Sequence, residues 1–135
     1  MARKVSDIEG IGPAFEEKLK TIGIKTVDHL LDKGCSAKGR AEIEEQTGID
    51  HKRVLAWVGM ADMFRIKGIA SQFAELLKAA GVDSIKELRN RNAENLHKKL
   101  VEINDEKKLA KATPRLDQVT DFIAQAKELD PKVTH

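Results

Sequence analysis

The chain of 135 residues is long enough for one domain or two very small ones, and its 41% hydrophobic and 34% charged residues indicate a folded protein rather than a disordered one. A net charge of +2 excludes a strongly basic protein, the single cysteine excludes an internal disulfide, and no apolar run is long enough to span a membrane. Leu, Ala, Lys and Glu dominate, while aromatic residues make up only 4%, a composition that favours helices over strands. We therefore expect an all-α, cytoplasmic protein without a secretory signal or a membrane partner.

The first element that the sequence predicts is a tight turn followed by a helix, at residues 8–13 (Ile-Glu-Gly-Ile-Gly-Pro). Gly10 and Gly12 permit a tight turn because glycine tolerates positive φ angles. Pro13 is suited to the first turn of a helix, and apolar residues follow it at helical spacing. Gly23 then ends this helix, as a glycine after a C-terminus does. The sequence therefore predicts a short helix, a glycine hairpin and a second helix.

The same pattern recurs 58 residues later in the chain. The matching positions are the glycines of the turns and the apolar residues of one helix face, which are the residues that such a unit needs. The clearest matching pairs are Ile8 and Ile66, Gly10 and Gly68, Ile11 and Ile69, Phe15 and Phe73, Leu19 and Leu77, and Gly23 and Gly81. We therefore predict two copies, over residues 1–61 and 62–135. Phe15, Phe73 and Trp57 are expected in the core.

Cap residues divide each copy into further helices. Thr26 and Ser84 precede apolar stretches at the same place in the two copies, as N-cap residues do. Ser36 and Asn92 are suited to cap the next helices, which we expect over about 37–47 and 93–103.

The last helix of each copy is predicted from apolar residues at positions i, i+3, i+4 and i+7. In the first copy this helix starts after Asp50 and continues to Ile66, so that it is also the first helix of the second copy. In the second copy it starts at Thr113-Pro114, where a cap residue precedes a proline. The predicted fold is all-α, with two tandem repeats of about five short helices each, joined by the shared helix into a compact unit.

These two copies resemble the helix-hairpin-helix motif of DNA repair and recombination proteins. In the first copy the resemblance is carried by residues 8–13 together with Leu19, Gly23 and Ile24. The second copy is similar to one family of tandem helix-hairpin-helix proteins whose own function is unknown. The similarity lies in short segments spread over this copy: residues 65–69, 74–77, 80–84, 91–92, 95–97 and 119–129. Over the two copies together, the resemblance covers nearly the whole chain and implies a fold of tandem helix-hairpin-helix units.

In helix-hairpin-helix proteins that bind DNA, backbone amides of the hairpin contact phosphates without reading the bases, and the resemblance implies the same here. Amides at a helix start carry partial positive charge and position a nucleic-acid backbone without specifying its sequence. Lys18, Arg65 and Lys67 are the basic side chains expected to assist. The implied phosphate-binding amides are those of Gly10, Ile11 and Gly12, and of Gly68, Ile69 and Ala70.

The resemblance also implies a monovalent cation on the hairpin carbonyls, as some proteins of this class hold one. The matching positions are Ser6, Ile8 and Ile11, and by the repeat Phe64, Ile66 and Ile69. No other metal and no cofactor is expected, because Cys35 with His29 or His51 matches no zinc spacing.

Both hairpins depart from the pattern of the DNA-binding class. The first is followed by Glu16 and Glu17, where DNA-binding copies often carry Lys or Arg. The second replaces a glycine by Ala70, although Arg65 and Lys67 make it the better candidate for phosphate. No nucleophile triad, phosphate-binding loop or carboxylate cluster points to an enzyme. The sequence favours a non-enzymatic, sequence-independent module that binds the DNA or RNA backbone, with a protein–protein adaptor or self-association module as the alternative.

Overall fold

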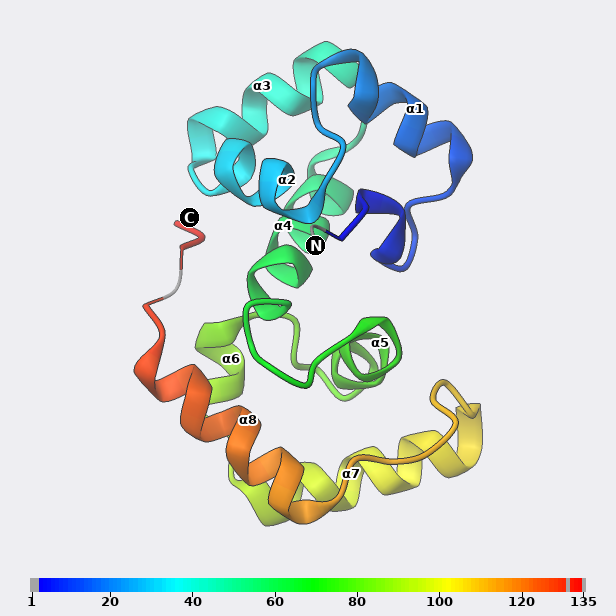
Figure 1. Cartoon of the computed structure of the whole chain (residues 1–135), viewed down its shortest axis with the longest axis vertical. Helices are drawn as coiled ribbons and strands as arrows, with labels where there is room; N and C mark the ends of the chain where they lie inside the picture. Colours follow the sequence, from blue (N-terminus) through cyan, green and yellow to red (C-terminus); the bar gives the residue numbers. More distant parts are fainter. Residues whose placement is uncertain (1–2, 131, 135) are drawn as a thin grey trace. The chain divides into compact units, whose positions relative to one another are not determined.

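Helices make up the regular structure of this protein in the part that the computed structural model describes, residues 3–130 and 132–134, and no strand is found there (Figure 1). This confirms the all-α prediction. The elements are a 3-10 helix, η1 (Val5–Asp7), followed by α1 (Pro13–Thr21), α2 (Val27–Gly34), α3 (Ala37–Thr47), α4 (His51–Met63), α5 (Ser71–Ala79), α6 (Ile85–Arg89), α7 (Ala93–Lys107) and α8 (Leu116–Glu128).

Contacts between the described residues divide the chain into two units. Unit 1 comprises residues 3–62 with 132–134, and unit 2 comprises residues 63–130. Residues 132–134 pack with unit 1, whereas the sequence placed them in the second repeat. Hydrogen bonds hold them there: the Thr134 N–H donates to the Cys35 carbonyl at 2.8 Å, the Lys132 N–H donates to the Asp62 carboxylate at 3.1 Å, and the Arg40 guanidinium donates to the Thr134 carbonyl.

Unit 1 is built from η1 and α1–α4 around apolar side chains that are withdrawn from solvent, among them Val5, Leu19, Leu30 and Ile43. Helix α2 packs against α3, and η1 contacts both α1 and α2. The predicted caps are confirmed. The Thr26 hydroxyl accepts from the His29 N–H at 3.1 Å, and the Ser36 hydroxyl accepts from the Gly39 N–H at 3.0 Å. These caps satisfy amides that the first turn of a helix leaves without a partner.

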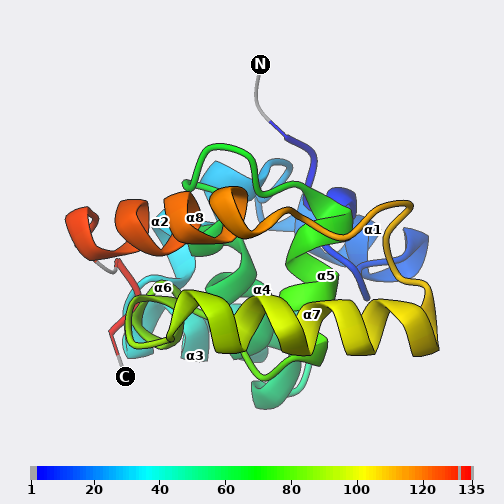
Figure 2. The ribbon, with the colours of Figure 1, turned by 90° about the horizontal axis from the view of Figure 1, so that it is seen from below.

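Unit 2 is built from α5–α8, with α8 lying beside α6 and α7 (Figure 2). Ser84 and Asn92 cap α6 and α7 as predicted, each accepting a hydrogen bond from the backbone amide three residues further on. The buried apolar faces of these helices meet in one core, whose largest side chains include Ile66, Ile69, Leu76, Leu88 and Leu100.

Helix α4 ends before the position that the sequence predicted for it. It stops at Met63 instead of continuing to Ile66, where the Ile66 N–H donates to the Met63 carbonyl at 3.0 Å and closes a four-residue turn. The prediction of one helix shared in full by both copies is therefore wrong. The second glycine turn is preceded by a short non-helical segment, residues 64–70, rather than by the end of a long helix.

The segment between α7 and α8 also differs from the prediction. Helix α7 continues past residue 103 to Lys107, and α8 starts at Leu116 with Arg115 as its N-cap, not at Thr113-Pro114. The cause is Asn104, a buried side chain whose amide group donates to the Ala110 carbonyl at 3.1 Å and to the Thr113 hydroxyl at 3.2 Å. Thr113 thus holds the connecting loop instead of capping a helix.

Candidate functional site

The two glycine turns, residues 8–12 and 66–70, have the same backbone geometry. In the first, the Ile11 N–H donates to the Ile8 carbonyl at 3.1 Å; in the second, the Ile69 N–H donates to the Ile66 carbonyl at 3.2 Å. Gly10 and Gly68 each occupy the third position of the turn with φ of 98°. A positive φ at this position is typical of a type II turn and explains why glycine stands there.

A helix of nine residues starts directly after each turn, and neither has a side-chain cap. Gly12 is the N-cap of α1 and Ala70 is the N-cap of α5, and neither residue has a polar side chain that can cap its helix. The first amides bonded to the N-cap carbonyls are those of Glu16 and Ala74, both at 2.9 Å. The start of each helix therefore keeps the partial positive charge of its first-turn amides.

The structure separates the six predicted phosphate-binding amides into two groups. The amides of Ile11 and Ile69 donate within their own turns, so they are not available to a phosphate, and both side chains are buried. We therefore remove them from the candidate site. The amides that have no hydrogen-bond partner among the described residues are those of Gly10, Gly12, Gly68 and Ala70.

The same hydrogen bonds bear on the predicted cation site. The carbonyls of Ile8 and Ile66 already accept from Ile11 and Ile69, while Ser6 lies exposed in η1. The other two positions in the second turn, Phe64 and Ile69, lie on either side of Ile66. In the described ranges, no group of three or more His, Cys, Asp and Glu side chains is placed to hold a metal ion.

Aromatic rings lie behind both glycines. A β-carbon added to Gly10 would lie 3.3 Å from the indole nitrogen of Trp57, and one added to Gly68 would lie 2.9 Å from Cε1 of Phe122. Trp57 also contacts Phe15, with ring centroids 5.2 Å apart, and Phe122 contacts Phe73 at 6.2 Å. The φ angle thus favours glycine at both turns, and the close approach of Phe122 adds a steric reason at Gly68.

Basic and acidic side chains alternate around the first turn. The Arg53 guanidinium lies 5.4 Å from the centroid of the Phe15 ring, and the Lys18 ammonium lies 6.0 Å from it. Arg53 also donates to the Asp50 carboxylate at 2.5 Å, and this hydrogen bond lowers the pKa of Asp50 below its usual value. Glu16 and Glu17 follow on α1, the second of them exposed. The sequence identified Lys18 at this turn but not Arg53.

The predicted basic residues of the second turn are held by groups on the following segments. The Arg65 guanidinium donates to the Asp130 carbonyl at 3.0 Å. Lys67 is exposed, and both of its backbone groups pair with the side-chain amide of Gln125: the Lys67 N–H donates at 2.9 Å, and the Lys67 carbonyl accepts at 3.0 Å. Gln125 therefore fixes the backbone of this turn, a role that no sequence pattern indicated.

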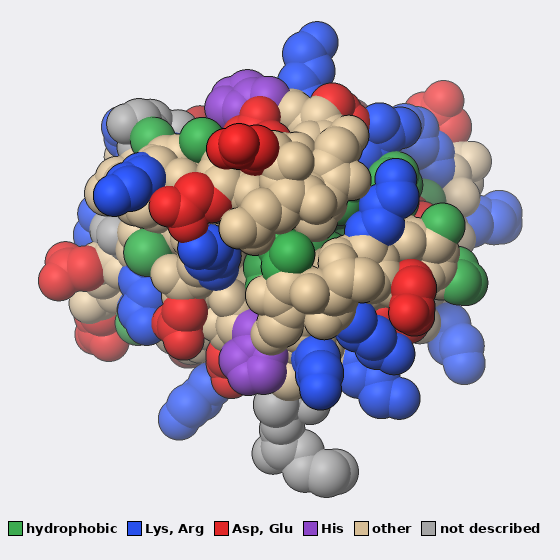
Figure 3. Space-filling view, turned by 90° about the horizontal axis from the view of Figure 1, so that it is seen from above, with side chains coloured by type: hydrophobic (Ala, Val, Ile, Leu, Met, Phe, Trp, Pro, Cys, Tyr) green, Lys and Arg blue, Asp and Glu red, His purple; other side chains and the backbone are tan. Residues whose placement is uncertain are grey.

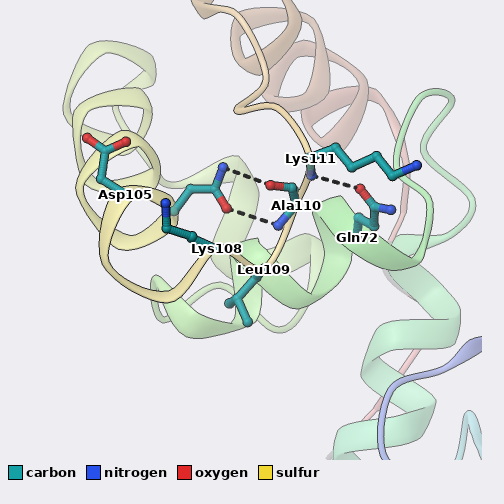
Figure 4. Close-up of a pocket in the computed structure, with 7 residues that line it drawn as sticks. Gln72, Asp105, Lys108, Leu109, Ala110 and Lys111 are labelled. Carbon is teal, nitrogen blue, oxygen red and sulfur yellow. Dashed lines mark hydrogen bonds between the residues drawn. The ribbon is translucent and has the colours of Figure 1, made fainter.

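Two adjoining pockets lie beside the start of α5. One, of about 330 Å³, is lined by residues 68 and 70–73, and the other, of about 630 Å³, lies under the loop after α7. Gln72 lines both pockets, and its side-chain oxygen Oε1 accepts from the Lys111 N–H at 3.2 Å (Figure 4). Lys111 thus lies next to the start of α5, and Lys108 lines the larger pocket together with Gln72. The only sequence signal for them was the extra length of the second copy.

Charge does not separate strongly on the face drawn in Figure 3. Figure 3, seen from above, shows Lys and Arg side chains interspersed with Asp and Glu side chains, and its hydrophobic side chains are in small separate groups. Of the described large hydrophobic residues, the exposed one is Leu116, with 41% of its surface accessible.

These features define an all-helical protein with two similar glycine turns, each opening an uncapped helix. The family described as "Domain of unknown function (DUF4332)" matches residues 9–129, and the chain therefore belongs to this family. No curated protein and no solved structure matches the chain. None of the helices in the described part of the chain combines the length and the apolar character needed to cross a membrane.

Proposed function

We propose that this protein is a non-enzymatic, sequence-independent nucleic-acid-binding module with two tandem helix-hairpin-helix motifs. In this proposal each glycine turn binds a phosphate of the backbone through its unpartnered amides. The observation that carries the proposal is that two turns 58 residues apart have the same φ of 98° at glycine and each precede a helix without a side-chain cap. Two equal anion-binding turns fit a ligand that repeats the same charged group.

The lack of sequence preference follows from the groups that the turns offer. Amides contact phosphate oxygens, which are the same at every nucleotide, whereas base edges are read by side chains in the grooves. Basic residues near the turns add positive charge, and they are Lys18, Arg53, Lys67 and Lys111. None of these side chains is aromatic, so they offer no platform on which the bases of single strands stack.

The experiment is a titration of fluorescently labelled duplexes of two unrelated sequences with the full chain, followed by anisotropy at about 50 and 200 mM salt. The expected result is equal affinity for both sequences and a steep fall with salt, because each bound phosphate releases counterions. Affinity that is independent of salt, or no binding at the lower salt, would refute the proposal.

Two substitutions test the turns without disturbing the fold. Gly12→Asp and Ala70→Asp each place a carboxylate at an N-cap, where it accepts from the first-turn amides and stabilises the helix. The same carboxylate occupies and repels the phosphate position, so the double variant should lose binding while remaining folded. Gln46→Glu adds one negative charge on the exposed surface of α3 and serves as the control for each of the two single variants, with unchanged affinity expected.

The alternative is a protein–protein adaptor or self-association module in which the turns are kept for structure alone. The observation that favours it is the near-neutral net charge of +2, together with the two glutamates at the start of α1. A self-associating chain that binds no duplex at low salt, as measured by light scattering and anisotropy on one sample, would support the alternative.

A further inference from the structure

We propose that the indole N–H of Trp57 is a phosphate donor of the first glycine turn, which makes this turn the stronger of the two phosphate sites. This inference rests on the proposed function and deepens it, because it names a side-chain contact and ranks the two turns. The ligand is the phosphate group of a nucleic-acid backbone.

Trp57 lies in α4 with only 3% of its surface exposed, yet its indole nitrogen has no hydrogen-bond partner among the described residues. In that part of the chain, the one buried side-chain nitrogen or oxygen without a partner is Arg40 Nε. The Trp57 nitrogen must therefore be in contact with solvent, at the small exposed portion of the ring. Buried indole N–H groups usually donate to an acceptor within the protein, whereas the N–H of Trp57 does not do so among the described residues and is left for a ligand.

The position of this donor is at the first turn. The indole nitrogen lies 3.3 Å from the point that a β-carbon of Gly10 would occupy, and Gly10 is exposed. The Gly10 amide is itself unpartnered among the described residues, as is that of Gly12 at the start of α1. Three donors without a partner among the described residues thus lie within one turn and the residue behind it. In our proposal one acceptor at this turn bonds to all three.

The charges around the turn favour an anionic acceptor over a neutral one. Phe15, which packs on Trp57, carries Arg53 and Lys18 near its ring. Against them stand Glu16 and Glu17 on α1, while Asp50 is already bonded to Arg53. A phosphate that accepts from the indole and the turn amides is stabilised by directed hydrogen bonds, which offset the two glutamates.

The second turn provides an internal comparison. Phe122 occupies the place beside Gly68 that Trp57 occupies beside Gly10, and both glycines have φ of 98°. A phenyl ring fills this space but donates no hydrogen bond. The second turn therefore has the same backbone with one donor fewer, although Arg65 and Lys67 make it the better candidate from sequence alone.

Trp57 is the single tryptophan of the chain, so its intrinsic fluorescence reports on the first turn alone. We would titrate the full chain with an unlabelled duplex and, separately, with inorganic phosphate. The expected result is a saturable change in emission in both titrations. If the duplex binds by anisotropy while the Trp57 emission stays constant, the inference is overturned and the proposed function stands.

The decisive variant is Trp57→Phe, which gives the first turn the residue that the second turn already has. Loss of one hydrogen bond to a charged group predicts about tenfold weaker duplex binding. Affinity equal to that of the unaltered chain would overturn the inference alone, whereas absence of any duplex binding by the unaltered chain would overturn the proposed function as well. Should Trp57→Phe misfold, an isostere with sulfur in place of the indole N–H keeps the packing and removes only the donor.

Discussion

A β-carbon added to Gly68 would lie 2.9 Å from Cε1 of Phe122, closer than packed carbon atoms approach. Gly68 also has φ of 98°, where residues with a β-carbon are strained. The two effects add, so Gly68→Ala should lower the free energy of unfolding by about 2 to 4 kcal/mol, measured by urea denaturation.

The matched control for this prediction is Gly12→Ser. Gly12 has φ of −85° and no atom within 4 Å of an added β-carbon, and a serine there would cap α1. Stability equal to or slightly above that of the unaltered chain is expected. If Gly68→Ala were as stable as Gly12→Ser, the described packing of Phe122 against the second turn would be incorrect.

Much of the fold could be predicted because its determinants are local. Thr26 and Ser36 bond to amides three residues away, so a cap is visible in the sequence next to the helix it starts. The true start of α8 could not be predicted, because the Thr113 hydroxyl accepts a hydrogen bond from Asn104 in the preceding helix, α7, and does not cap α8. Long-range packing has no such local signature.

The candidate site shows the same division. The glycines of both turns could be predicted from the sequence, because the backbone conformation of such a turn favours glycine. The donor that we assign to the first turn could not be predicted in this way. Trp57 is apolar in a helical pattern, and the pattern correctly places its ring in the core. Only the three-dimensional arrangement reveals that its nitrogen lies at Gly10. A period of apolar residues reports burial and contains no information on which atom of a ring reaches the surface.

The end of α7 offers a substitution that should stabilise the protein. Lys108 follows the helix in the left-handed region with φ of 52°, the one such non-glycine residue in the described chain. Glycine adopts this conformation without a β-carbon penalty, so Lys108→Gly should raise the free energy of unfolding by about 1 kcal/mol. Lys107→Gly, one residue earlier and still helical, should lower it by up to about 1 kcal/mol. Equal shifts of the thermal midpoint would contradict the assigned helix end.

Acid should weaken the protein through carboxylates that are paired in the folded state. A hydrogen bond from Lys33 lowers the pKa of Glu42, and hydrogen bonds from Arg53 and Arg115 lower the pKa values of Asp50 and Asp117. A carboxyl group whose pKa is lower in the folded chain than in the unfolded chain stabilises the fold at any pH above its unfolded pKa, which is about 4.3 for Glu. This stabilisation is lost as the pH falls through the pKa of the folded chain.

The urea midpoint should therefore fall as the pH is lowered below about 5. Glu42→Gln should flatten this dependence, because the side chain that pairs with Lys33 is then a glutamine, which is uncharged at every pH. Glu45→Gln, at an exposed position further along α3, is the control and should leave the slope unchanged. A Glu42→Gln slope as steep as that of the unaltered chain would show that the Lys33 pair contributes no pH-dependent stability.

A further prediction concerns Arg40, which is a buried cation without a carboxylate partner among the described residues. It is 3% exposed; one guanidinium nitrogen donates to the Gly34 carbonyl at 2.8 Å, another donates to the Thr134 carbonyl, and Nε has no partner. Arg40→Met removes two hydrogen bonds together with the cost of burying an unpaired charge. These effects offset each other, so the overall stability should change by less than about 1 kcal/mol.

The segment that Arg40 holds should respond far more than the overall stability does. Loss of a charge-assisted hydrogen bond to Thr134 raises the population in which residues 132–134 are detached by about tenfold. Trypsin should then cleave after Lys132 faster in Arg40→Met, as followed by the loss of mass from the C-terminus. Lys38→Met, an exposed substitution on the same helix, should leave the cleavage rate unchanged. Equal cleavage rates in the two variants would mean that the Thr134 N–H bond to Cys35 and the Lys132 N–H bond to Asp62 suffice to hold the segment.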